Sequence, residues 1–266
     1  MTLVQAMLLG LVQGLTEFLP VSSSGHLVLA RVLLHIGETP VFFDVLLHIS
    51  TLLVIIIVFR KRIGAIFAAL GRGIVKKTGE GDAEHRRLFF VIVLATAITV
   101  VVGFGISKLN MEGRPKIIAL LLTVTGIILL LTRFFKGSDD YSTIGVKAGI
   151  ITGLVQGIGV FPGISRSGIS IAGGLASGLS REKAGEFAFL IAIPAILGAF
   201  VLELKDVPAL ERTVGIPALC AGMAAAFAAG LFSLLLLLRA VKKGRLYLFS
   251  IYLIPAVILY FILLTV

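Results

Sequence analysis

The sequence predicts an all-α integral membrane protein with six transmembrane helices and two re-entrant helical hairpins in an inverted-topology repeat. The chain has 266 residues, of which 58% are hydrophobic and 14% charged, whereas a soluble domain carries about 25% charged residues. Several apolar runs reach 19 residues or more, and about 20 apolar residues cross the hydrocarbon core of a bilayer. Two further apolar stretches are broken in the middle and nearly repeat each other.

The first element is a broken stretch, residues 2–35, which the segment LPVSSSG divides into two halves. Neither half is long enough to span a bilayer, so we expect a helix–loop–helix unit that enters and leaves the membrane on one side. Irregular backbone at membrane depth is tolerated where it is buried in protein or lines a polar cavity. Residues 145–179, broken by FPGISRSG, predict a second hairpin of the same kind.

Three uninterrupted apolar segments follow each hairpin, and they predict the six transmembrane helices. These are residues 41–59, 88–107 and 115–135 after the first hairpin, and 184–204, 213–238 and 246–265 after the second. Residues 60–87 between the first two form a strongly basic loop.

An internal repeat relates the two halves. When the chain is shifted by 143 residues, positions 10–25 match positions 153–168 at nine of sixteen places. We therefore expect a first repeat at 1–144 and a second, inverted repeat at 145–266 within one membrane domain. Inverted repeats with broken helices are also the construction of many secondary transporters, so the architecture alone leaves enzyme and transporter both open.

Lysine and arginine set the orientation of membrane helices, because cytoplasmic loops carry the excess of these residues. With the 60–87 loop inside, the alternating loops place 17 Lys and Arg inside and five outside. Both termini then face outside, the first hairpin enters from the outside and the second from the inside. The net charge of +10 is explained by these loops and by contact with anionic lipid, so we expect no nucleic-acid partner.

The first hairpin loop gathers groups that suit an anion. Gln13 and Glu17 are spaced i, i+4 and share a helix face. The chain then turns at Pro20, passes three serines, and starts a second helix near His26. A helix start presents free backbone N–H groups and the positive end of the helix dipole, which favour phosphate.

The second loop repeats this arrangement and adds Arg166, whose planar guanidinium can hold phosphate through paired hydrogen bonds. If the tips meet, one pocket holds Glu17, His26, Arg166 and six hydroxyls. The hydroxyls are those of Ser22, Ser23, Ser24, Ser165, Ser167 and Ser170. Buried ionisable groups are costly in hydrocarbon and usually mark a working site.

Structural interpretations stand beside these. Serine and glycine also allow membrane helices to pack closely. Gln13 and Gln156 could bond the broken backbone, His26 could cap a helix, and Arg166 could be a partner of Glu17. Asp44 and His48, another i, i+4 pair, are expected to line the interior or an interface rather than to act as catalysts.

Three other phosphate chemistries do not fit. No glycine-rich P-loop precedes a Lys-Ser/Thr pair, and the lone Cys220 has no arginine-bearing loop after it. Membrane phosphatases of the phosphatidic-acid type need an arginine followed by a histidine after five residues, but the sixth position after Arg166 is Ala172.

Two long motifs resemble those of the undecaprenyl-diphosphate phosphatase (bacitracin-resistance protein) family. The first is (E/Q)xxxE leading into a serine-rich turn and a histidine, here QGLTEFLPVSSSGH. The second is PGxSRSxxT, here PGISRSGIS. The resemblance extends over essentially the whole chain in length, hairpin placement and repeat.

The resemblance implies removal of the terminal phosphate of a C55 polyprenyl diphosphate, which supports cell-wall peptidoglycan synthesis and bacitracin resistance. It implies catalytic roles for Glu17, His26, Arg166 and Ser23, a divalent cation (Mg²⁺ or Ca²⁺) held by Glu17, and a site toward the outer face of the plasma membrane. The substrate-binding residues that it implies are Gln13, Ser22, Ser24, Gly25, Gly163, Ser165, Ser167, Gly168 and Ser170.

The chain departs from the family pattern at two positions. Gln13 stands where many members have glutamate, which argues against a metal held by two carboxylates, and Ser170 stands where the pattern has threonine. The chemistry expected is phosphoryl transfer by positioning and charge, with His26, Ser23 or water as the nucleophile; we favour His26. The rival functions are a flippase of polyprenyl phosphate that uses the same pocket, and a lipid-binding scaffold. A homodimer is left open.

Overall fold

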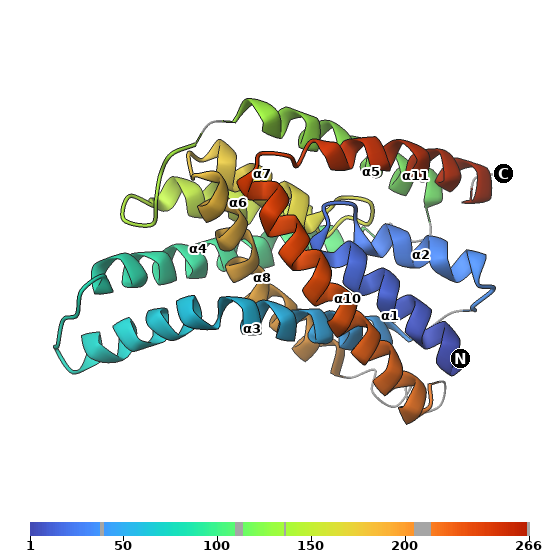
Figure 1. Cartoon of the computed structure of the whole chain (residues 1–266), viewed down its shortest axis with the longest axis horizontal. Helices are drawn as coiled ribbons and strands as arrows, with labels where there is room; N and C mark the ends of the chain where they lie inside the picture. The colour runs from blue at the N-terminus through green and yellow to red at the C-terminus, as the bar shows by residue number, and fades with distance from the viewer. Residues whose placement is uncertain (38–39, 110–113, 136, 205–213, 265–266) are drawn as a thin grey trace.

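The computed structural model describes residues 1–37, 40–109, 114–135, 137–204 and 214–264, and in these ranges the chain is built from α-helices (Figure 1). The first half contains α1 (Leu3–Phe18), α2 (Ser23–Leu33), α3 (Val41–Ile74), α4 (Asp82–Ser107) and α5 (Pro115–Leu131), which ends in a short 3-10 turn at Thr132–Phe134. The second half contains α6 (Val146–Ile158), α7 (Arg166–Ala176), α8 (Arg181–Glu203), α10 (Ile216–Lys242) and α11 (Leu248–Leu264).

Both predicted hairpins are present as helix–turn–helix pairs, broken where the sequence indicates. The turn from Leu19 to Ser22 separates α1 from α2, and the turn from Gly159 to Ser165 separates α6 from α7. Pro20 and Pro162 lie in these turns, where the missing backbone N–H of proline costs no helical hydrogen bond.

Five of the described helices are long and apolar enough to cross a membrane. They are Val41–Ile74, Asp82–Ser107, Lys116–Phe134, Arg181–Glu203 and Ile216–Lys242. The sixth predicted span corresponds to α11, which is strongly apolar but has 17 described residues. The predicted boundaries at 213 and 265, and two basic residues counted outside, Lys205 and Arg212, lie outside the described residues. The chain is therefore a multi-pass membrane protein.

The segment 60–87, predicted as a basic loop, is mostly helical. Helix α3 continues to Ile74, and α4 already begins at Asp82. Both helices therefore extend beyond their apolar stretches and carry most of the basic side chains of this segment. Arg62 on α3 forms ion pairs with Glu84 on α4 and Glu186 on α8, which ties these three helices together at this end.

The first helix of each half packs against a helix of the other half. Helix α1 lies against α10 of the second half, and its repeat counterpart α6 lies against α4 of the first half. The final helices α5 and α11 also pack together, along one side of the bundle in Figure 1. Repeat-equivalent glycines make the contacts of α1 and α6 possible, because a Cβ on Gly10 would lie 2.1 Å from the carbonyl oxygen of Gly222 and one on Gly153 would lie 2.6 Å from that of Ala95.

Candidate active site

The turns of the two hairpins meet in the interior. The hydroxyl of Ser22 accepts a hydrogen bond of 3.1 Å from the backbone amide of Gly163. Both residues have left-handed backbone, with φ of 71° at Ser22 and 96° at Gly163, a region that glycine tolerates and serine rarely adopts. The expectation that the two loops meet is confirmed. The strained backbone of Ser22 is costly, and such strain is typical of turns at functional sites.

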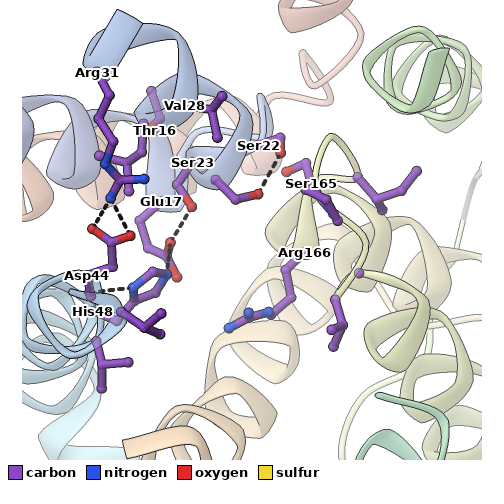
Figure 2. Close-up of a pocket in the computed structure, with 18 residues that line it drawn as sticks. Thr16, Glu17, Ser22, Ser23, Val28, Arg31, Asp44, His48, Ser165 and Arg166 are labelled. Carbon is purple, nitrogen blue, oxygen red and sulfur yellow. Dashed lines mark hydrogen bonds and ion pairs between the residues drawn. The ribbon is translucent and has the colours of Figure 1, made fainter. Parts of the chain in front are cut away.

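A cavity of about 240 Å³ opens between these turns and the first turns of α3 (Figure 2). Its polar lining comes from both hairpins and from α3. The polar side chains are those of Thr16, Glu17, Ser22, Ser23, Ser24, Arg31, Asp44, His48, Ser165 and Arg166. Helices α2 and α7 both begin at this cavity, so the positive ends of two helix dipoles face it.

Glu17, at the end of α1, is the acceptor on which the polar side chains converge. Its Oε2 atom accepts hydrogen bonds from Gln13 Nε2 at 3.1 Å and from the Ser23 hydroxyl at 2.7 Å. His48 Nε2 lies 3.4 Å from the same oxygen. Two of these partners come from the first hairpin and the third from α3, so the carboxylate is fixed by two separate elements of the fold.

The hydrogen bonds of His48 place a proton between His48 and Glu17. The Nδ1 atom of His48 lies 2.8 Å from the carbonyl oxygen of Asp44, which can only accept, so Nδ1 carries a hydrogen. An attractive contact between Nε2 and Glu17 then requires one more proton on either partner. The pair consequently holds one exchangeable proton beside the Ser23 hydroxyl.

The rim of the cavity carries an ion pair. Both carboxylate oxygens of Asp44 accept hydrogen bonds from Arg31 Nη2. This pairing joins α2 to α3 and occupies the second acidic side chain of the cavity, so that Glu17 is left as the carboxylate that faces a ligand.

Arg166, the first residue of α7, lines the cavity from the second hairpin. In the described part of the chain its guanidinium has no hydrogen-bond or ion-pair partner, in contrast to Arg31 and Arg62. The preceding Ser165 caps the helix, because its side chain accepts a hydrogen bond from the amide of Gly168. The half-buried, unpaired guanidinium is thus held at the site by the fixed start of its helix.

A second, smaller cavity of about 20 Å³ is also lined by Glu17 and Arg166. Two of the predicted substrate-binding serines, Ser167 and Ser170, line this cavity rather than the larger one. Four predicted substrate-binding residues line neither cavity: Gln13, Gly25, Gly163 and Gly168. Gln156 belongs to the smaller cavity and bonds Thr99 and the backbone of Ile191.

His26 lines neither cavity. Its Nδ1 atom lies 2.8 Å from the carbonyl oxygen of Ser22, and its Nε2 atom lies 3.0 Å from the hydroxyl of Tyr252 on α11. The two rings stack with centroids 5.7 Å apart. Its catalytic role stays a prediction, and its contacts within the structure tie the first turn to α11.

Sequence reasoning gave His48 and Asp44 a lining role, and both do line the cavity. The contact between His48 and Glu17 was missed. The signal that could have found it is a polar i, i+4 pair near one end of an otherwise apolar span, since ionisable groups at such places face the bundle interior. Arg31 was also missed, because it lies two turns beyond the serine motif.

Known proteins resemble this chain over nearly its whole length. The family model described as "Bacitracin resistance protein BacA" matches residues 6–259. A protein named undecaprenyl-diphosphatase from Treponema denticola is 44% identical over 255 residues, which cover 96% of this chain and 95% of that protein. Proteins of the same name from Desulfosudis oleivorans and Korarchaeum cryptofilum are 43% and 38% identical, and the matches cover 94–95% of each chain.

Proposed function

The chain belongs to the family of the bacitracin resistance protein BacA, and we infer from this membership and from the cavity that it is a membrane phosphatase of undecaprenyl diphosphate. It hydrolyses the terminal phosphate to give the monophosphate carrier lipid and inorganic phosphate. The alternative of a polyprenyl phosphate flippase is not favoured by the names of its relatives. The reaction supplies carrier lipid for cell-wall synthesis and accounts for resistance to bacitracin.

The observation that carries the assignment to this cavity is the unpaired guanidinium of Arg166 beside two helix starts. An arginine without a partner is costly inside a membrane bundle unless it binds an anion. Its planar fork matches the oxygens of a phosphate. We propose that the diphosphate lies between Arg166 and the first turn of α2, with the polyprenyl chain leaving the cavity past the Val41 end of α3.

Glu17 is proposed as the proton acceptor of the reaction. It lines the cavity, it is fixed by Gln13 and Ser23, and it shares a proton with His48. His48 balances the charge of Glu17 and passes the proton on. Ser22, Ser24 and Ser165 line the same cavity and surround the phosphate oxygens with hydroxyl groups. Catalysis then rests on positioning and charge, as is general for phosphoryl transfer.

The divalent cation that the family resemblance implies would have Glu17 as its ligand. Among the described residues no three His, Cys, Asp or Glu side chains gather as an all-protein metal site. One carboxylate together with phosphate oxygens is a usual donor set for Mg²⁺, so the residues present fit a cation that binds together with the diphosphate. Such a cation would supply positive charge to the phosphate oxygens.

The predicted topology is retained as part of the proposal. We propose that both helix–turn–helix pairs are re-entrant, that α11 is the sixth membrane crossing, and that the protein lies in the plasma membrane. The larger cavity is lined by the first residues of α3. The opposite end of α3 is basic and is expected to be cytoplasmic, so we propose that the cavity opens toward the outer face. His26 is proposed to act by holding the Ser22 turn against Tyr252.

The direct test is phosphate release by the purified full-length protein in detergent with undecaprenyl diphosphate. The wild type should release phosphate, and Glu17→Gln should release little while keeping the melting temperature of the wild type. A wild type that transports polyprenyl phosphate in liposomes but releases no phosphate would contradict the proposal.

A further inference from the structure

Two residues that line the smaller cavity, Gln156 and Ser170, each have a buried polar atom without a partner within the described ranges. Gln156 Oε1 and Ser170 Oγ have no hydrogen-bond partner among the described residues, and the two residues are 0% and 1% exposed. The orientation of the Gln156 amide is fixed, because its Nε2 donates to Thr99 Oγ1 at 3.2 Å and to the carbonyl oxygen of Ile191 at 3.3 Å. The carbonyl oxygen is therefore the atom that needs a donor.

The size and lining of the cavity select its ligand. Its volume of about 20 Å³ exceeds the roughly 10–15 Å³ that one water molecule needs on this measure. A buried acceptor without a partner destabilises the fold, and a water that donates to Gln156 Oε1 and bonds the Ser170 hydroxyl would remove this cost. The other walls are largely apolar, with Phe18, Ile55 and Phe189 among them.

The location of this cavity relates it to the reaction. Glu17 and Arg166 are the two residues that line both cavities, so they separate the smaller one from the larger. Ile55 lies seven residues beyond His48 on α3, a rise of roughly 10 Å along the helix. The smaller cavity is therefore on the far side of Glu17 and Arg166 from the Val41 end of α3.

We propose that this cavity holds the water molecule that attacks the terminal phosphorus. The inference rests on the proposed function. In phosphoryl transfer the attacking and leaving oxygens lie in line on opposite sides of the phosphorus. The leaving group is the lipid monophosphate, which extends through the larger cavity, so the attacking oxygen must come from the side of Gln156 and Ser170.

The step balances as follows. The water oxygen forms a bond to the terminal phosphorus while the bond from phosphorus to the bridging oxygen breaks, and its electron pair stays on the lipid monophosphate. One proton of the water is released to the solvent, and the new bond from phosphorus to oxygen remains in the inorganic phosphate product. Gln156 and Ser170 are positioning residues for the water. Ser23, which lines the larger cavity, then binds and orients rather than attacks.

A pair of variants of nearly equal volume tests the inference. Ser170→Thr keeps the hydroxyl and adds a methyl group, whereas Ser170→Val has a similar size without the hydroxyl. We expect Ser170→Thr to stay close to the wild type and Ser170→Val to lose about 100-fold in kcat, since small misplacements of a reactant have such effects. The KM should stay nearly constant, because the lipid diphosphate binds in the larger cavity. Ser170→Ala serves if the Val variant does not fold.

A rapid-quench experiment with terminally labelled diphosphate supplies an independent readout. Direct attack by water predicts that no label is bound to the wild-type protein or to Ser170→Val. A covalent label on Ser23 or His26 would overturn the inference, as would equal kcat in the Thr and Val variants. If the wild type releases no phosphate at all, the proposed function fails first and this inference with it, so the two failures are distinguishable.

Discussion

The hydroxyl of Ser22 and the backbone amide of Gly163, 141 residues apart, form a 3.1 Å hydrogen bond that joins the two hairpin turns. Next to it, a Cβ on Gly168 would lie 3.0 Å from Pro20 Cβ, so the two turns also pack closely. Glu17 and Ser23 come from one turn and Arg166 from the other. Neither half of the chain therefore contains the candidate site by itself.

Loss of the Ser22 hydroxyl should loosen this junction. In Ser22→Ala the buried amide of Gly163 loses its acceptor, which costs about 1–3 kcal/mol. We expect a lower melting temperature and lower phosphate release than in the wild type. Ser107→Ala is the matched control, because the Ser107 hydroxyl bonds only a carbonyl of its own helix at an exposed position. Equal melting temperatures of the two variants would show that the bond does not hold the turns together.

Arg166→Lys should lose most of the activity in a folded protein. Lysine keeps the positive charge but offers a single point contact where the guanidinium offers a planar, bidentate one. We expect kcat/KM to fall by about 100-fold or more. Phosphate release and the melting temperature should be measured together, with Arg60→Lys at an exposed position of α3 as the control. Full activity of Arg166→Lys would mean that charge alone is sufficient at this position.

His48→Gln separates the hydrogen bond to Glu17 from the proton that the pair shares. The glutamine amide can donate to Glu17 Oε2 but cannot take up a proton. We expect a folded protein with kcat reduced by about 10²-fold or more, the size of a typical general acid–base contribution. Its pH–rate profile should lose one ionisation. His35→Gln, at an exposed position after α2, is the control. A profile identical to that of the wild type would remove His48 from the proton path.

Cysteine labelling in intact cells tests the orientation. In a Cys220→Ala background, Lys77→Cys in the turn between α3 and α4 should be inaccessible to a membrane-impermeant maleimide, and Arg114→Cys before α5 should be labelled. Both positions are exposed in the structure. Permeabilised cells should label both variants and so confirm that the thiols are reactive. The reverse pattern would place the larger cavity on the cytoplasmic side.

The sequence was most informative where polarity interrupts a hydrophobic run. The two breaks, the helices on either side of them and the meeting of their turns could all be predicted, because polar turns at membrane depth must be buried together. The contact of His48 with Glu17 could not. Whether His26 or His48 contacts Glu17 depends on how α3 and α11 pack against the first hairpin, and this is a long-range relationship without a local pattern.

The length of α3 was also misjudged, for a physical reason. Hydropathy marks the part of a helix that lies in hydrocarbon, so the apolar run ends near Phe59 while the helix continues to Ile74. The basic residues of this extension bind acidic partners, as Arg62 binds Glu186 and Arg72 binds Asp82. A charged sequence is thus no signal that a helix has ended.

The glycine contact between α1 and α10 has a consequence for biosynthesis. Gly10 leaves the ribosome 212 residues before Gly222, the residue whose backbone it touches. At about 5–20 residues per second this interval is roughly 10 to 40 s. During this time the first hairpin is in the nascent chain without the helix that covers it. The glycine face of α1 must therefore stay free of other helices in the membrane until the second half of the chain has been synthesised.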